Sequence, residues 1–231
     1  MQRRMTKGYN NTSHSFLRLS AKSVPTSLRM VLLLLFPTFS SCELFSTRTP
    51  ASPDPGSTFV WTPAATPQYL LDNFKGTIEV LDATNYTKCF MSTKDSSVTG
   101  DRPVFSFSPR SGLDAVSLSK FYPWDTHSEQ NFMTKLRSSL VASPRLTVTF
   151  SSININQTNS NSADITANYL ILLPVQSNST IPASISGLMT LHLVLVTTEE
   201  ATKEWRIVSW IDFALPTGNS STFTDLKAQL I

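Results

Sequence analysis

The sequence predicts an α+β fold, with helices in the first part of the domain and antiparallel strands in the last. Glu204–Asp212 holds two tryptophans, two isoleucines and a valine in nine residues, and Leu188–Thr197 alternates apolar residues, so both are predicted strands. The polar linker Thr198–Lys203 between them has the length of a hairpin connection. Upstream, apolar residues recur three and four positions apart, which is the spacing of a helix.

The closing strand has large apolar residues on both of its faces. Strict alternation puts on one face Trp205, Ile207 and Ile211, and on the other Arg206, Val208, Trp210 and Asp212. In the partner strand the residues that point one way are Met189, Leu191, Leu193 and Leu195. We therefore expect the closing strand to lie inside the sheet, covered at least in part on each side.

Three helices are predicted before these strands. The first begins at Thr66, a capping residue, with Pro67 in its first turn. A shorter helix covers Ala83–Met91. The third is capped by Asp125 or Thr126, because short polar side chains accept hydrogen bonds from the free N–H groups of a first turn.

The remaining segments are shorter or more polar. Pro144 is expected to end the third helix. Further strands are predicted at Pro103–Ser108, Leu146–Phe150 and Asp164–Leu173, with Asn154–Ser162 as a hairpin tip. Residues 108–120 have no clear pattern. Residues 216–231 are predicted to be a polar tail with a last helical turn at 225–230.

The charge distribution argues against nucleic-acid binding. Six basic residues and no acidic ones precede Cys42, which leaves 13 basic and 16 acidic residues from Cys42 onward, a net charge of −3. A nucleic-acid-binding surface needs Lys and Arg clustered on the folded part of the chain. The mature domain is mildly acidic instead, so we expect no nucleic-acid partner.

No metal or cofactor is expected. The chain has two cysteines and three histidines, and none of them has CxxC, HxxxH or HExxH spacing. Neither of the common glycine-rich phosphate-binding motifs occurs, and the whole chain has only seven glycines.

A short apolar run follows the basic N-terminal stretch. Residues 30–39 are mostly apolar and are followed by small residues. A helix needs roughly 20 apolar residues to cross about 30 Å of hydrocarbon, so this run is too short to be a membrane span. The pattern predicts a signal peptide over residues 1–41.

Phe39-Ser40-Ser41-Cys42 resembles the lipobox of bacterial lipoproteins, except that Phe39 stands where leucine is usual. The resemblance implies cleavage before Cys42 and acyl chains, such as palmitate, on the new N-terminal residue, which together anchor a protein stably to a membrane. The alternative is an ordinary secretory signal, with Cys42 free or paired to Cys89.

Residues 42–66 are predicted to be the lipidated cysteine and a flexible tether. Five prolines lie among Ser, Thr and Ala between Glu43 and Pro67, a composition typical of an extended linker. Glu43 follows the cysteine where aspartate would indicate the inner membrane, so the resemblance favours the outer membrane. The folded domain is then expected over residues 67–215, followed by the tail of 216–231.

The order of the predicted elements resembles the nuclear transport factor 2-like superfamily. In that cystatin-like α+β cone, a curved antiparallel sheet wraps around a long N-terminal helix. The resemblance rests on four segments, Leu70–Phe74, Tyr86–Phe90, Trp124–Phe132 and Trp205–Asp212. More narrowly, the chain is similar to uncharacterised bacterial lipoproteins with this fold, although Asp82–Asn85 departs from their usual pattern. The resemblance implies a fold but no activity.

The superfamily includes isomerases and cyclases, which place a carboxylate or histidine and a tyrosine inside the cone. A proton-transfer site of this kind could use His192 and Asp212 on adjacent strands, with Tyr86 as the donor to a developing oxyanion. In the alternative, which we favour, His192 faces outward and Asp212 pairs with Arg206 or caps a neighbouring backbone group.

Four aromatic residues are candidates for lining a ligand pocket or a partner-binding surface: Trp124, Tyr69, Trp205 and Trp210. Packing in the core is the alternative for each, and Trp124 is the best candidate for the mouth of the cone. We expect a lipid-anchored, non-catalytic envelope protein that binds a small apolar ligand or a protein partner, with a homodimer formed through the sheet as one option. An isomerase- or cyclase-like enzyme and a structural subunit of an envelope assembly are the alternatives.

Overall fold

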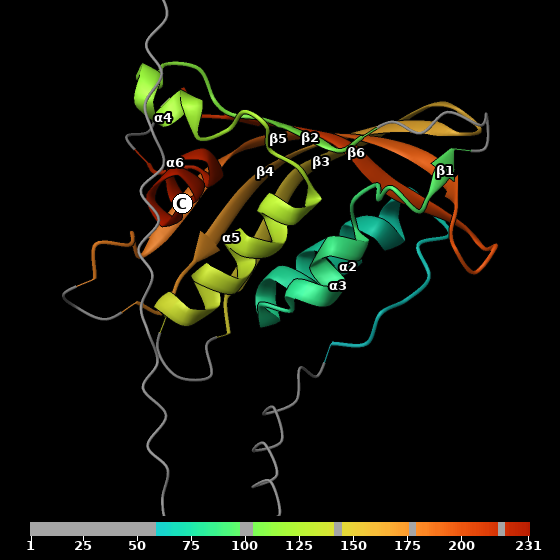
Figure 1. The fold of residues 1–231 in the computed structure, drawn as a ribbon, viewed down its shortest axis with the longest axis horizontal. Coiled ribbons are helices and arrows are strands. Elements are labelled where there is room, and N and C mark those ends of the chain that lie inside the picture. The colour runs from blue at the N-terminus through green and yellow to red at the C-terminus, as the bar shows by residue number, and fades with distance from the viewer. Residues whose placement is uncertain (1–58, 98–103, 141–144, 176–178, 217–219) are drawn as a thin grey trace, which may run out of the picture. The chain divides into compact units, whose positions relative to one another are not determined.

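A curved antiparallel sheet with helices on one face makes up the chain in the computed structural model, which describes residues 59–97, 104–140, 145–175, 179–216 and 220–231 (Figure 1). The strands are β1 (Ser96–Ser97), β2 (Ser106–Ser108), β3 (Thr147–Asn159), β4 (Ser162–Leu172), β5 (Ser184–Thr197) and β6 (Lys203–Phe213). Their order is β2-β6-β5-β4-β3, with β1 beside β5, and among the described pairs of named strands only β2–β6 is parallel.

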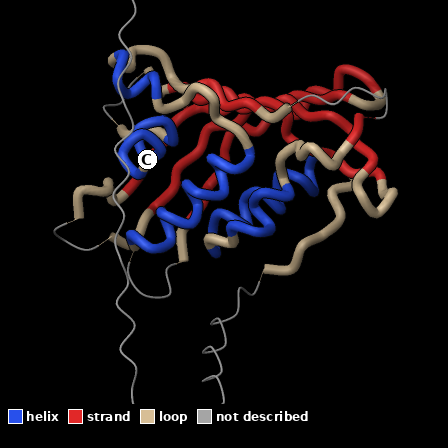
Figure 2. The backbone as a smooth tube through the Cα atoms, in the orientation of Figure 1, coloured by secondary structure: helices blue, strands red, loops and turns tan. Residues whose placement is uncertain are grey.

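The described residues also form helices, and the longest of them pack on one face of this sheet. The helices are α2 (Pro67–Val80), α3 (Ala83–Lys88), α4 (Ala115–Ser119), α5 (Thr126–Ser139) and α6 (Phe223–Leu230). Figure 2 shows the helices α2, α3 and α5 on the same side of the sheet, and α6 lies beside α5 near one end. The predicted α+β fold, with a curved antiparallel sheet wrapped around the N-terminal helix, is therefore confirmed.

Helix starts follow the predicted capping residues. Thr66 accepts a hydrogen bond from the backbone N–H of Tyr69 with Pro67 in the first turn, and Asp125 caps α5 through Ser128 N–H. The second helix is shorter than predicted and ends at Lys88. Pro144, predicted to end the third helix, lies outside the described residues, and α5 itself ends at Ser139.

The predicted hairpin of β5 and β6 is confirmed, but the alternation predicted for β6 is wrong beyond its middle. Ser209 pairs with His192 and Ile207 with Leu193, so Val208 is an extra residue in a β-bulge. The bulge reverses the side-chain parity, and Trp210 consequently lies on the same buried face as Ile207.

The predicted hairpin tip also differs from the structure. The strands β3 and β4 extend through most of the predicted tip at Asn154–Ser162, because Asn156 pairs with Asp164 and Asn159 with Ser162. Polar composition suggested a loop there, whereas cross-strand pairing continues almost to the turn.

The C-terminal residues belong to the core, although the sequence placed 216–231 outside the domain. Helix α6 starts with a capping box formed by Thr222 and Asp225, and it buries Phe223, Leu226 and Lys227. The end of the predicted tether also packs on the domain: Ala64 is fully buried and its carbonyl accepts from the backbone N–H of Trp205.

The predicted signal peptide, Cys42 and the tether up to residue 58 lie outside the described residues. Within the described ranges, no helix has both the length and the apolar character needed to cross a membrane.

Candidate functional site

The centre of the cone holds a polar cluster of four side chains from which solvent is almost fully excluded. The carboxylate of Glu129, on α5, accepts a hydrogen bond from Lys227 Nζ at 2.5 Å and from Trp124 Nε1 at 2.8 Å through one oxygen. Its other oxygen accepts from the hydroxyl of Tyr86, on α3, at 2.9 Å. Glu129, Lys227 and Tyr86 are each 0% exposed and Trp124 is 4% exposed.

Aromatic rings surround the Lys227 ammonium. The nearest two ring centroids, of Phe107 and Trp210, lie 3.5 and 3.8 Å from Nζ. Three more lie within 6 Å, and they belong to Trp124, Phe132 and Phe223. The faces of these rings carry negative electrostatic potential, so they stabilise a cation that has lost its water.

Burial changes the acid–base chemistry of this cluster. It lowers the pKa of Lys227 to about 8, against the opposing effect of Glu129, which favours the charged amine. Burial, reinforced by the adjacent Glu129 charge, raises the pKa of Tyr86 well above its ordinary value, so this hydroxyl remains a donor. Glu129 thus opposes the effect of burial and favours the ammonium form of Lys227.

A second polar cluster joins β4, β6 and α6. Asp212 is 0% exposed and accepts from the hydroxyl of Tyr169 at 2.7 Å. It also accepts from the backbone N–H of Thr224 at 2.8 Å and from the hydroxyl of Thr224 at 2.7 Å. The Tyr169 hydroxyl in turn accepts from the backbone N–H of Phe223 at 2.9 Å. Asp212 and Tyr169 thus satisfy two of the free N–H donors in the first turn of α6, those of Thr224 and Phe223.

Gly187 allows Tyr169 to reach Asp212. These two residues lie on β4 and β6, and Gly187 stands opposite Tyr169 on β5 between them. A Cβ at position 187 would lie 2.7 Å from the Tyr169 ring and 2.7 Å from the Phe213 carbonyl oxygen. A side chain there would therefore displace the tyrosine from its position.

The structure does not bring His192 and Asp212 together. His192 Nδ1 lies 2.5 Å from a carboxylate oxygen of Asp164 on the outer face of the sheet, where its side chain is 41% exposed. Asp212 points into the core. The predicted alternative of an Asp212–Arg206 pair is wrong, because Arg206 binds Glu204 instead at 2.8 Å. Asp212 does cap a backbone group, that of Thr224.

The other candidate residues are divided between the core and the surface. Tyr86, Trp124, Trp205 and Trp210 are buried, so Trp124 does not line an open mouth. Tyr69 is 48% exposed on α2. Only Tyr86, Trp124 and Trp210 of this set contribute to the cluster around Lys227.

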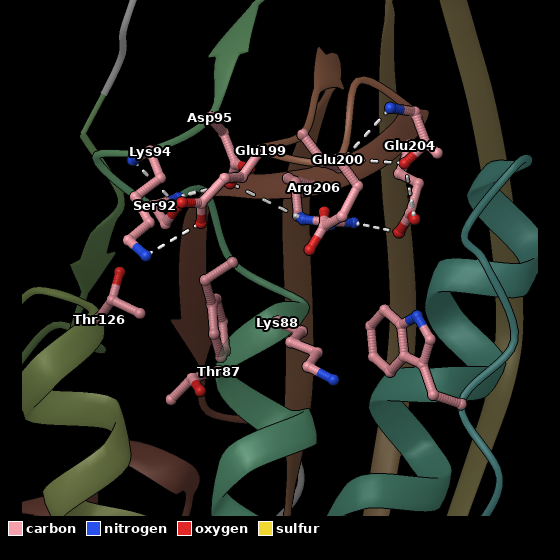
Figure 3. A pocket seen from close by; sticks show the side chains of 14 residues that line it. Thr87, Lys88, Ser92, Lys94, Asp95, Thr126, Glu199, Glu200, Glu204 and Arg206 are labelled. Atoms are coloured by element: carbon pink, nitrogen blue, oxygen red, sulfur yellow. Dashed lines mark hydrogen bonds and ion pairs between the residues drawn. The ribbon is translucent and has the colours of Figure 1, made fainter.

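A separate groove of about 480 Å³ lies at the other end of β6, near the β5–β6 turn (Figure 3). Its wall includes Arg206, which lies between Asp95 and Glu204, with Nε 3.8 Å from an Asp95 oxygen. At its rim, Lys94 pairs with Glu199 at 2.9 Å. The charges of the groove thus largely compensate one another.

No metal centre is built by the described residues, which contain no group of three or more His, Cys, Asp and Glu able to hold an ion. Cys89 is a free, fully buried thiol, and burial raises its pKa to about 12. The thiol therefore stays protonated and packs as a small apolar group.

Sequence reasoning missed Glu129 and Lys227 as a pair. Glu129 was not among the candidate site residues, and Lys227 lay in the predicted tail. The helical spacing of Phe223, Leu226 and Leu230 was the available signal that this segment packs against the domain. No local pattern indicates that a lysine 98 residues from the glutamate reaches it.

Neither a protein-family model nor a curated protein matches the chain. Among solved structures it is similar to a nuclear transport factor 2-like superfamily protein from Salmonella enterica serovar Typhimurium, with 14% identity, a TM-score of 0.43 and coverage of 65% of this chain and 89% of the other. A cystatin-like domain of unknown function from Nostoc punctiforme gives 14% identity, a TM-score of 0.40 and coverage of 64% and 74%. A nuclear transport factor 2-like protein of unknown function in nutrient uptake from Rhodospirillum rubrum gives 7% identity, a TM-score of 0.41 and coverage of 64% of this chain and 97% of the other.

Proposed function

We propose that this protein is a lipid-anchored cell-envelope protein whose cone-shaped domain binds a protein partner and does not catalyse a reaction. The observation that carries the proposal is the filled centre of the cone. Glu129, Lys227 and Tyr86 are inaccessible to solvent and bonded to one another, so a substrate cannot reach them in this conformation. A small apolar ligand inside the cone is disfavoured for the same reason.

The outer face of the sheet is the surface that we assign to the partner. Leu170 and Leu172 on β4 are 43% and 47% exposed, and Phe213 on β6 is 41% exposed. Phe213 stands opposite Leu188 of β5, so these side chains occupy the same end of one sheet face. Exposed apolar groups gathered in this way are typical of protein interfaces.

A second copy of the chain is the partner to test first. We expect Leu170→Lys to halve the mass of the detergent-extracted full-length protein measured by light scattering, because a lysine pair would be buried across a two-fold interface. Val116→Lys is the matched control, since Val116 is 73% exposed and lies on the helix α4, outside the strands that carry Leu170, Leu172 and Phe213. A monomeric wild-type protein would contradict self-association through the sheet.

Lipid anchoring is tested at Cys42. We expect wild-type protein to incorporate labelled palmitate and to sediment with outer membranes, and Cys42→Ala to lose both properties because the acyl chains have no attachment site. Cys89→Ala is the control and should leave labelling unchanged, since Cys89 is buried in the domain. Palmitate incorporation into Cys42→Ala would contradict the assignment.

A further inference from the structure

Lys227 ends in a site that has both parts of an ammonium receptor. A buried carboxylate accepts its hydrogen bond at 2.5 Å, and two ring centroids lie within 4 Å of Nζ. Cages of this composition recognise ammonium ligands because the rings compensate for the water that the cation has lost. An external ligand could use this site only if the groups around Nζ stay in place without the C-terminal helix.

The walls of this site come almost entirely from other elements. Glu129 lies on α5, Phe107 on β2 and Trp210 on β6, whereas only Phe223 among the five rings belongs to α6. Tyr86 and Trp124 orient the Glu129 carboxylate independently of α6. Displacement of α6 would therefore remove the cation and Phe223, whereas Glu129 and the other four rings belong to parts of the chain outside α6.

The orientation of Trp210 favours the same interpretation. Its Nε1 is the one buried side-chain nitrogen or oxygen atom, within the described part of the chain, that has no hydrogen-bond partner. An unpaired buried N–H is unfavourable. The indole is placed instead with its ring face toward the ammonium, with the centroid 3.8 Å from Nζ. The indole therefore contacts the cation through its ring face, while its Nε1–H has no hydrogen-bond partner.

The geometry points to a binding site for a primary alkylammonium ligand at the centre of the cone, occupied in this structure by Lys227 of the chain's own C-terminal helix. The hydrogen bond to Glu129 requires an ammonium with an N–H, which a quaternary ammonium lacks, and the group that makes this bond in the structure is the primary ammonium of Lys227. An external amine competes with a tethered one, so it binds when α6 is displaced. This inference goes beyond the proposed function: the interior is closed to solutes while α6 is in place, and the inference concerns the state in which α6 is displaced.

The first test restores the cation from solution. Lys227→Ala removes Cγ, Cδ, Cε and Nζ, which together have the size of n-propylammonium. We expect n-propylammonium chloride to raise the Tm of full-length Lys227→Ala by about 3 °C or more at concentrations well above its Kd. An equal concentration of 1-propanol or sodium chloride should have a much smaller effect. Equal stabilisation by 1-propanol would overturn the assignment of a cation site.

Glu129 provides the specificity control. In the double variant Glu129→Gln/Lys227→Ala the carboxylate is lost but an acceptor oxygen remains. We therefore expect the rise in Tm caused by n-propylammonium to be at least tenfold smaller, and the effect of 1-propanol on Tm to change little. An undiminished response to the ammonium would also contradict the proposal.

The second test uses the wild-type protein and does not depend on the folding of a variant. Hydrogen exchange of the backbone amides of residues 220–231 is followed by mass spectrometry as n-propylammonium is added. A ligand that binds only the opened state should accelerate exchange of α6 in proportion to its occupancy, while β5 and β6 stay protected. Exchange of α6 that is insensitive to the ammonium would show that Lys227 is not displaceable and would overturn the proposal.

Discussion

Replacing Glu129 by alanine is expected to destabilise the domain by about 3–5 kcal/mol, because it leaves a buried ammonium without its counter-charge. The same substitution removes the acceptor of the Tyr86 hydroxyl and of the Trp124 indole N–H. Urea denaturation followed by tryptophan fluorescence measures the effect, since Trp124 and Trp210 are buried in the folded state.

A double variant separates the lost ion pair from general damage. Lys227→Met keeps a long side chain without a charge, and Glu129→Gln keeps an acceptor oxygen. We expect Glu129→Gln/Lys227→Met to be more stable than Glu129→Ala and within about 2 kcal/mol of the wild type, because a buried ion pair replaced as a whole costs little. The single variants Glu129→Gln and Lys227→Met complete the comparison. If their losses of unfolding free energy add up to the loss of the double variant, direct pairing of Glu129 with Lys227 is contradicted.

Replacing Asp212 by alanine should cost about 3 kcal/mol and should loosen α6 first. The carboxylate accepts three hydrogen bonds, from Tyr169 and from the backbone and hydroxyl of Thr224, and no solvent is available to replace it. Denaturant unfolding gives the free-energy change, and hydrogen exchange of residues 220–231 shows whether α6 is released before the sheet.

His192→Ala is the matched control for this prediction. His192 and Asp212 were sequence-based candidates for one site, but His192 is partly exposed and bonds Asp164 on the outer face. We expect His192→Ala to change the free energy of unfolding by no more than about 0.5 kcal/mol. A large loss for His192→Ala together with a small one for Asp212→Ala would contradict the opposite orientations of these residues.

The sequence predicted well what depends on local chemistry. Thr66 with Pro67 and Asp125 start helices where capping rules place them, and the hairpin of β5 and β6 follows from alternation across a short polar linker. These features are confirmed because each is decided within a few residues of the chain.

Features that depend on contacts distant in sequence could not be predicted. The bulge at Val208 adds one residue to β6 and moves Trp210 and Asp212 to the face of Ile207, a change that alternation alone cannot reveal. The burial of α6 was likewise missed, because Phe223 and Leu226 are its only fully buried apolar residues and Lys227 is buried by pairing with Glu129.

Candidate functional residues were harder still to group. Tyr86, Trp124 and Trp210 were identified as candidates for separate reasons, and they meet around a lysine that was assigned to a tail. Glu129, which accepts hydrogen bonds from Tyr86, Trp124 and Lys227, lies 43 residues from Tyr86 and 98 from Lys227. A single sequence carries no signal for such pairs, whereas the fold brings them together by packing α3, α5 and α6 on the same sheet face (Figure 1).

Side-chain NMR of Lys227 shows whether this lysine occupies the aromatic cage inside the cone. The rings of Phe107 and Trp210 lie so close to Nζ that their ring currents should shift the Lys227 methylene protons far upfield, with Lys227→Met identifying the signals. We also expect these signals to titrate near pH 8. Lys227 protons at the shifts of an exposed lysine, titrating near pH 10.5 as the ordinary side chain does, would show that the helix does not fill the cone.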